Sequence, residues 1–312
     1  MMSELEIGRL MNLRFTVLGL AILTVSQFSW SEIGHGIGLG IQHQTQKFEL
    51  ASDTLNLAVR SQKIQYQLTS GPWLFTLSAS EGDTSQSQLN IPNQPRYQLQ
   101  FEQNSQSIYL DYNFKQAWVS VGISQTNQEQ FYQYNFSGTR AQNTSEIGYT
   151  SYYADLGYGW YFDDGQLLLT TGITQQSSNE EFEYLQSINN VGNSSNQGDV
   201  NQSGWLGNIN LNYQHYFVLN ESLHGLIGAG INHSRSLDGE THLSQTTRTR
   251  LASTQLLSSD EEFYIESDSR STSLTLQTGL ITDFGNLNLS ADKLTSENWK
   301  DSVVELGLTL YF

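Results

Sequence analysis

Cysteine is absent from the chain, and proline occurs only three times in 312 residues. A chain without cysteine has no disulfide, no thiolate metal ligand, no thiol nucleophile and no lipidated cysteine of the bacterial lipoprotein kind. Any attachment to a membrane must therefore come from the fold itself.

Charge is also scarce, because Asp, Glu, Lys and Arg together make up 14% of the residues. Acidic residues outnumber basic ones by 31 to 14, which gives a net charge of −17. Such a chain is a poor partner for nucleic acid, or for anionic lipid head groups through a basic patch. The rest of the composition, rich in Asn, Gln, Ser, Thr, Gly and aromatic residues, suits a barrel with lipid outside and polar side chains inside.

The sequence lacks an apolar run long enough to cross a membrane as a helix, which needs about 20 residues. Its predominantly apolar amino-terminal stretch, residues 15–25, follows Arg14 and precedes small residues at Ser29 and Ser31. This arrangement is typical of a secretory signal peptide. We therefore predict that residues 1–31 are a cleaved signal and that residues 32–312 form an outer-membrane β-barrel.

Residues 302–312 at the carboxyl terminus alternate between apolar and polar side chains and end on Phe312. This period of two predicts a strand with one apolar and one polar face. The pattern recurs along the chain, and short turn-forming separators alternate with long polar ones. Five short turns and six long loops predict an all-β, closed antiparallel transmembrane β-barrel of twelve strands, with both termini on the periplasmic side. The short separators are 70–72, 115–116, 163–165, 220–222 and 285–286; the long ones lie around 44–53, 81–95, 125–148, 175–203, 234–270 and 294–301. Strand-like pieces within the long segments, at 131–136 and 263–265, predict that some strands project beyond the membrane.

One face of each predicted strand is almost free of charge and is expected to face lipid. The polar side chains that alternate with it are predicted to line the lumen: Lys63, Gln65, Tyr109, Asp111, Asn113, Tyr153, Asp155, Asn210, Asn212, His224, Gln277, Asp283, Asp292, Glu305 and Tyr311. Aromatic residues near the short turns predict a girdle at the head-group boundary. This girdle consists of Trp73, Phe114, Trp118, Phe162, Phe217, Phe284 and Phe312, although Trp118 also falls on a luminal position.

Two predicted strands change phase along their length. Val59 is at an odd position and Ile64 at an even one, and the same holds for Phe101 and Ile108. Because a shift of one residue turns every side chain to the other face, we expect a bulge or a loop-to-strand transition between the two phases.

The predicted lumen contains more carboxylates than lysines, so a water-filled lumen would weakly favour cations. Alternatively, the same polar residues satisfy one another in a hydrogen-bonded plug. Glycines at positions 34, 36, 38 and 40 are also predicted to face inward. They either make room for a luminal segment or permit tight curvature of the sheet.

The sequence offers little support for an enzyme. His233 and Ser234 are adjacent, but neighbours on a strand point to opposite faces and do not readily form a dyad. The His-x-Ser-Asn pattern of outer-membrane acyl hydrolases is absent. We therefore predict no catalytic residue, no enzymatic activity and no cofactor. Acidic loop clusters at 180–183 and 260–268 either gather divalent cations near lipopolysaccharide or are solvated charge, and no metal site is predicted because calcium-loop spacing is missing.

The signal, the alternating strands and the terminal Tyr311-Phe312 resemble Gram-negative outer-membrane barrels across residues 33–312. Residues 153–159 and 305–308 are similar to the twelve-stranded translocator domain of autotransporters. The resemblance implies an outer-membrane location, contact with outer-membrane lipid and lipopolysaccharide, and recognition of the closing strand by the barrel-assembly machinery. The barrel begins close to the cleavage site, so no passenger is expected.

Two functional hypotheses follow from this architecture. The first is an autotransporter-like or porin-like narrow pore or transport protein. The second is a non-conducting surface barrel whose long polar loops mediate adhesion or envelope organisation.

Overall fold

The computed structural model describes residues 33–50, 53–88, 96–189, 192–251, 256–266, 269–296 and 300–312. The predicted signal peptide lies outside these residues. Within them, no helix is long and apolar enough to cross a membrane. The regular structure consists of β1 (Ile33–Leu50), β2 (Asp53–Ser70), β3 (Trp73–Gln88), β4 (Arg96–Phe114), β5 (Ala117–Phe136), β6 (Thr139–Phe162), β7 (Gly165–Ile188), β8 (Gly192–Asn220), β9 (Leu223–Leu251), β10 (Leu256–Glu266), β11 (Arg270–Thr282), β12 (Gly285–Ser296) and β13 (Lys300–Tyr311).

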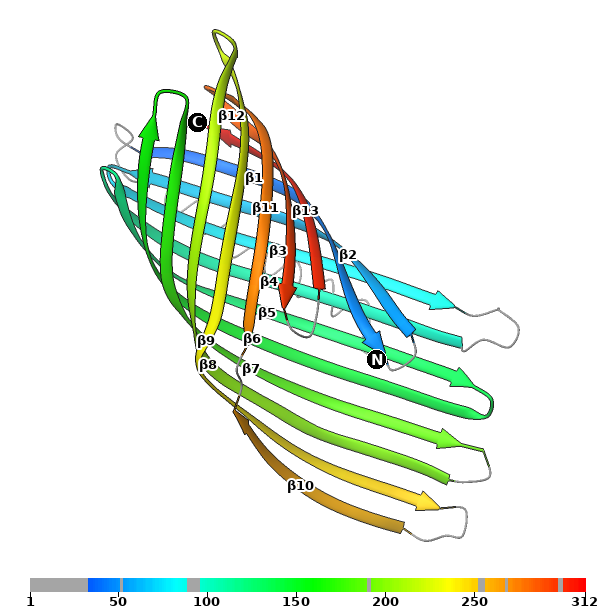
Figure 1. The fold of residues 1–312 in the computed structure, drawn as a ribbon. Coiled ribbons are helices and arrows are strands. Elements are labelled where there is room, and N and C mark those ends of the chain that lie inside the picture. Colours follow the sequence, from blue (N-terminus) through cyan, green and yellow to red (C-terminus); the bar gives the residue numbers. More distant parts are fainter. Residues whose placement is uncertain are drawn as a thin grey trace.

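The strands close into an antiparallel barrel (Figure 1). Each strand from β1 to β9 pairs with the next, β9 also pairs with β11, and β11, β12 and β13 lead back to β1. These twelve strands confirm the predicted fold class. The remaining strand, β10, pairs with β9 over Glu240–Arg250 and lies outside the closed ring. Backbone hydrogen bonds between His35 and Phe312 join the first and last strands, at the end of the barrel where β1 begins and β13 finishes.

The short turns lie at residues 71–72, 115–116, 163–164, 221–222 and 283–284. The prediction of the last turn at 285–286 is wrong, because Gly285 and Asn286 already pair with β13. Asp283, which was predicted to line the lumen, lies in this turn instead. Phe284 lies there too, so it is a turn residue beyond the end of β11 rather than part of a strand face.

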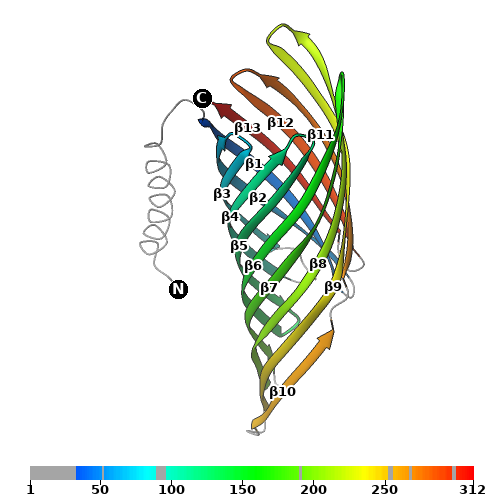
Figure 2. The same cartoon turned by 90° about the vertical axis from the view of Figure 1, so that its left-hand side faces the viewer.

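Most residues of the long polar segments continue the strands, which project as the strand-like pieces at 131–136 and 263–265 predicted. The connecting loops are therefore shorter than predicted. Residues 125–136 and 139–148 form one hairpin, which turns at Ser137 and Gly138 with φ of 50° and 85°. Positive φ at both central residues is the geometry of a tight hairpin turn whose twist matches its strands. β8 and β9 each reach 29 residues, compared with 12 in β12 and in β13. Figures 1 and 2 show the long strands running past the ends of the short ones.

The barrel thus has two regions, which we name by their place along the strands. The proximal barrel contains the five short turns and all twelve strands of the ring. The distal extension comprises the described parts of residues 53–62, 79–106, 125–151, 174–206 and 237–266.

Neither the bulge nor the loop-to-strand transition expected at the phase changes of β2 and β4 is present. Both strands keep one continuous register with their neighbours through these positions. Val59 and Phe101 therefore point into the barrel, where they are 0% and 2% exposed, and they pack with Leu99 and Tyr132. In these two strands the change of phase is a change in which face is apolar, since Val59, Leu99 and Phe101 are buried on the inner face.

The β8–β9 pair contains two shifts of register. At the first, Leu206 pairs with Ser236 and Trp205 with Asp238, which leaves Leu237 as an extra residue in β9. This bulge lies where β9 changes partner, because its pairing with β11 ends at Arg235 and its pairing with β10 begins at Glu240. Beyond Leu237, even-numbered residues of β9 face outward instead of inward.

Candidate functional site: the lumen and the outer face

The pairing registers place the predicted lumen residues, apart from Asp283, on the inner face of the proximal barrel. The apolar residues that alternate with them lie on the outer face and include Leu39, Leu156 and Leu276, which are 57%, 60% and 63% exposed. An exposed apolar belt around a closed sheet is the arrangement expected for contact with lipid. The inner-face residues are Lys63, Gln65, Tyr109, Asp111, Asn113, Tyr153, Asp155, Asn210, Asn212, His224, Gln277, Asp292, Glu305 and Tyr311.

Trp118 does not belong to an outer girdle. It pairs with Asn113 and Gly157 at an inner-face position of β5. Its indole packs directly over Gly157, where a β-carbon would collide with the ring. The aromatic side chain is therefore accommodated inside the barrel, because the opposite residue has no side chain.

The other girdle residues on strands lie on the outer face near the short turns: Trp73, Phe114, Phe162 and Phe217. Tyr112 links two of them, because its ring centroid lies 4.5 Å from that of Trp73 and 4.4 Å from that of Phe114. Phe312, beyond the last residue of β13, stacks on His35 with the centroids 5.9 Å apart. Sequence reasoning did not assign Trp160 to the girdle, although its ring contacts Tyr158 at 4.9 Å on the same face.

Inside the barrel, polar side chains reach across glycines to the strand next but one. Lys63 Nζ on β2 lies 3.4 Å from Glu305 Oε1 on β13. β1 runs between these strands, and its Gly40 leaves the space that the two side chains use. The ring of Tyr311 likewise lies over Gly36. A β-carbon at Gly36 would be 3.1 and 3.2 Å from two atoms of that ring.

The same arrangement occurs on other parts of the wall. Asn208 on β8 donates to Asp155 on β6 at 3.4 Å, across Gly172 of β7. The rings of Tyr109 and Tyr153 lie 5.8 Å apart on either side of Gly122.

A further instance lies between β8 and β11. Gln277 on β11 donates to Asn212 on β8 at 3.3 Å, and its side chain lies over Gly228 of β9. Each of these interactions joins strands two positions apart, so they run along the wall of the lumen. The inner glycines therefore admit side chains from their neighbours.

The inner face of the proximal barrel is acidic. Among its described strand residues, Asp111, Asp155, Asp292, Asp301 and Glu305 carry carboxylates and Lys63 carries the opposing ammonium. Several of these acids are held in place, since Asp111 accepts a bond from Ser120 and Asp292 accepts one from Thr275. Fixed carboxylates around a lumen attract cations and repel anions.

The outer face of the distal extension carries a row of carboxylates that sequence reasoning missed. Asp83 pairs with Glu102, Glu102 with Glu129, and the row continues in register to three further strands. Burial, and then the charges of Glu102 and Glu146, raise the pKa of the Glu129 carboxyl. The pairing partners become visible only when the strands are aligned. We call this set the acidic row: Asp83, Glu102, Glu129, Glu146, Glu181 and Asp199.

The acidic clusters expected in loops lie in strands β7 and β10, except that Asp268 lies outside the described residues. Glu180 accepts a bond from Ser145 at 2.6 Å, and Asp260 accepts one from Thr246 at 2.8 Å. In the part of the chain that the structure describes, no group of three or more His, Asp or Glu side chains is arranged to hold a metal ion. His233 faces outward, where its ring bonds to Thr272 at 3.0 Å, while Ser234 lies at an inner position.

No protein-family model matches the sequence, and no curated protein sequence matches it significantly. Solved structures do match. The translocator domain of autotransporter NalP from Neisseria meningitidis aligns with a TM-score of 0.64 and 10% identity, over 96% of this chain and 96% of that one. The β-domain of the Bordetella autotransporter BrkA aligns with a TM-score of 0.57 and 10% identity, over 90% of this chain and 100% of that one. The chain therefore has the fold of an autotransporter-type translocator barrel.

Proposed function

We propose that this chain is an integral outer-membrane barrel that acts as a narrow, weakly cation-selective pore or transport protein and has no enzymatic activity. The observation that carries the proposal is the opposite character of the two faces of the proximal barrel. The outer face is an apolar belt, and the inner face holds Asp111, Asp155, Asp292 and Glu305 against Lys63. The named polar contacts run along the wall, as in a lumen that water can enter.

The environment is part of this proposal. A cleaved signal peptide would deliver the chain to the periplasm of a Gram-negative cell, and the closing strand with Phe312 would be read by the barrel-assembly machinery. The outer belt would then contact outer-membrane lipid and lipopolysaccharide. The similarity to the NalP and BrkA translocator barrels supports this environment through the shared fold.

Planar-bilayer recording of the refolded protein tests conduction. We expect discrete current steps with a preference for cations, and we expect Asp155→Asn and Glu305→Gln to lower that preference because each removes an inner charge. Glu262→Gln, on the outer face of β10, is the matched control and should leave selectivity unchanged. If the refolded protein shows no current steps at any voltage, the pore is excluded.

The distal extension favours a second function, a non-conducting surface barrel for adhesion or envelope organisation. Strands of up to 29 residues carry a large ordered sheet beyond the apolar belt, which a simple pore does not need. Deleting residues 240–266 tests this alternative. If the deletion lowers adhesion of whole cells and the parent protein shows no bilayer conductance, the surface function is supported and the pore is not.

A further inference from the structure

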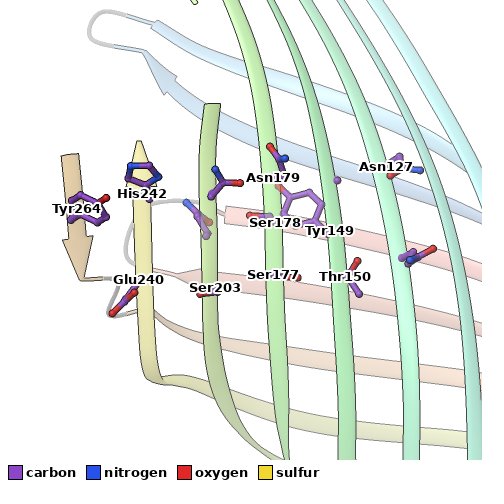
Figure 3. Close-up of a pocket in the computed structure, with 14 residues that line it drawn as sticks. Asn127, Tyr149, Thr150, Ser177, Ser178, Asn179, Ser203, Glu240, His242 and Tyr264 are labelled. Atoms are coloured by element: carbon purple, nitrogen blue, oxygen red, sulfur yellow. The ribbon is translucent and has the colours of Figure 1, made fainter. Parts of the chain in front are cut away.

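The outer face of the distal extension contains an open groove of about 600 Å³ (Figure 3). Two rows of side chains in register form much of its lining. One row runs from Gln125 through Thr150, Ser177 and Ser203 to Glu240. The second row runs beside it and ends on an aromatic pair: Asn127, Gly148, Asn179, Asn201, His242 and Tyr264. The groove thus spans β5 to β10.

Its chemistry combines amides and hydroxyls with an aromatic platform. The His242 and Tyr264 rings stack with their centroids 4.5 Å apart and their planes 24° apart. Tyr264 is 76% exposed, so one face of this platform is open to a ligand. Asn and Ser side chains both donate and accept hydrogen bonds, which suits a ligand that carries many hydroxyl groups.

A polar atom in this groove lacks a partner. Nε2 of His242 is buried and forms no hydrogen bond in the structure. A buried nitrogen without a partner costs free energy, and a turn of the His242 ring that exposes Nε2 to a ligand hydroxyl would recover it. Asn201, in the neighbouring strand, donates to Asp199 at 2.9 Å, so its amide is oriented along the same face.

The charges around the groove restrict its ligand. The acidic row lies one outer-face position further along three of its strands, where Glu129, Glu181 and Asp199 follow Asn127, Asn179 and Asn201. Glu240 adds a carboxylate inside the groove. An anionic ligand would be repelled by these carboxylates at close range. The groove therefore favours uncharged sugars over phosphorylated ones.

The position of the groove indicates where such sugars come from. On β5 and β6, Gln125 and Thr150 are the first outer-face residues after Ile123 and Tyr152 of the apolar belt. One strand step of two residues is about 7 Å, so the groove begins immediately beyond the belt. In the proposed outer membrane, this level is occupied by the sugars of lipopolysaccharide.

We propose that this groove binds neutral oligosaccharide, with a sugar ring on the His242–Tyr264 platform and its hydroxyls on the amide rows. The lipopolysaccharide source rests on the proposed outer-membrane location, whereas saccharide binding itself does not. The bulge at Leu237 is essential to the site, because it turns Glu240 and His242 to the outer face. β10, the strand that pairs with β9 outside the ring, supplies Tyr264 to the site.

Calorimetric titration of the refolded protein in detergent tests the proposal. The probes are core oligosaccharide released from lipopolysaccharide, the same oligosaccharide after dephosphorylation, and maltoheptaose. We expect saturable binding of the dephosphorylated core and weaker binding of the phosphorylated form. Tyr264→Ala and His242→Ala should each weaken binding by several-fold to about tenfold, the range of a lost aromatic contact.

His43→Ala is the matched control, because His43 lies on the outer face of β1, away from the groove, and should bind as the parent does. Heat-modifiable gel migration of every variant shows that the barrel is folded. Binding of maltoheptaose as tightly as the core would support a general neutral-saccharide site, and binding of the core alone would assign the ligand to lipopolysaccharide. The proposal is overturned if no probe binds saturably, if the phosphorylated core binds more tightly, or if both groove variants bind as the parent does. Failure of conduction in bilayers would leave this result unaffected.

Discussion

The proximal barrel and the distal extension share strands, but β4 places its apolar side chains on opposite faces in the two regions. In β4, Leu110 and Ile108 face outward on the apolar belt, whereas Phe101 and Leu99 face inward and are almost fully buried. No bulge separates them, since the register between β3, β4 and β5 is continuous. The difference shows that the surrounding solvent decides which face is apolar. Lipid requires an apolar exterior, and water requires the apolar side chains to be inside.

The largest expected effect comes from emptying the interior of the distal extension. Phe101→Ala should destabilise this region by about 3–5 kcal/mol, because it leaves a cavity beside Val59, Leu99 and Tyr132. Limited proteolysis of the folded barrel should then cut within the extension while the proximal barrel stays intact. Phe131→Ala is the control, since Phe131 lies on the outer face of β5. Equal resistance of the two variants to the protease would show that the buried cluster around Phe101 does not stabilise the extension.

A charge on the apolar belt should destabilise the protein nearly as much as the loss of Phe101, because the belt faces lipid. Leu110→Lys should cost about 2–4 kcal/mol in unfolding experiments with lipid vesicles, because it places an ammonium in contact with hydrocarbon. Thr76→Lys lies on the inner face of the adjacent strand and should be much better tolerated. If both substitutions cost the same, the outer face of the proximal barrel is not a lipid face.

A smaller effect is expected where a side chain reaches over glycine in the proximal barrel. Gly172→Ala would place a β-carbon against the Asp155 carboxylate and 2.6 Å from the Ala154 carbonyl oxygen, so it should destabilise the barrel by about 1–3 kcal/mol. Gly148→Ala, in the distal part of β6, has its nearest neighbour at 3.7 Å and should be nearly neutral. Denaturant unfolding of both variants measures the difference. A neutral Gly172→Ala would mean that Asp155 moves freely and that its contact with Asn208 is unimportant.

The smallest effect concerns the acidic row. Because burial and neighbouring carboxylates raise the pKa of Glu129, the folded state binds its proton more readily than the unfolded chain does. The distal extension should therefore gain stability as the pH falls from neutral through this raised pKa, and the gain should stop below the ordinary value of about 4.3.

Replacing the charge isolates this contribution. Glu129→Gln should remove that part of the pH dependence and stabilise the extension by a few tenths of a kcal/mol at neutral pH, since the carboxyl is only partly buried. Protease protection of the extension across the pH range provides the measurement. Gln133→Glu, further along the same face of β5, would add a charge outside the row and should not reproduce the effect. An unchanged pH profile in Glu129→Gln would contradict the assignment to this residue.

The strand faces of the proximal barrel could be predicted because lipid imposes a strict alternation. The register places Lys63, Asp155 and Glu305 inward, and the apolar residues between them outward, as the period of two required. The long polar segments were predicted as loops with strand-like pieces at 131–136 and 263–265, because apolar side chains in them are few. Polar strands in water look like loops when only hydrophobicity is considered.

The errors at single residues have local causes. Trp118 was placed in the girdle by its nearness to a turn, but Gly157 on the next strand accommodates its ring inside the barrel. Asp283 and Phe284 were assigned to strand faces because Gly285 and Asn286 resemble a turn. Gly285 and Asn286 instead pair with β13 as the first residues of β12, so the turn lies two residues earlier, at 283–284.

The sequence by itself determined that the chain closes into twelve strands and which side chains of each proximal strand face outward, because both follow from local alternation and turn spacing. Only the tertiary structure decided which residues meet across strands. Glu129 lies beside Glu102 and Glu146, which are 27 and 17 residues away along the chain. His242 reaches the outer groove through the single extra residue at Leu237. Register depends on turn geometry and bulges, and a change of one residue turns a side chain to the other face.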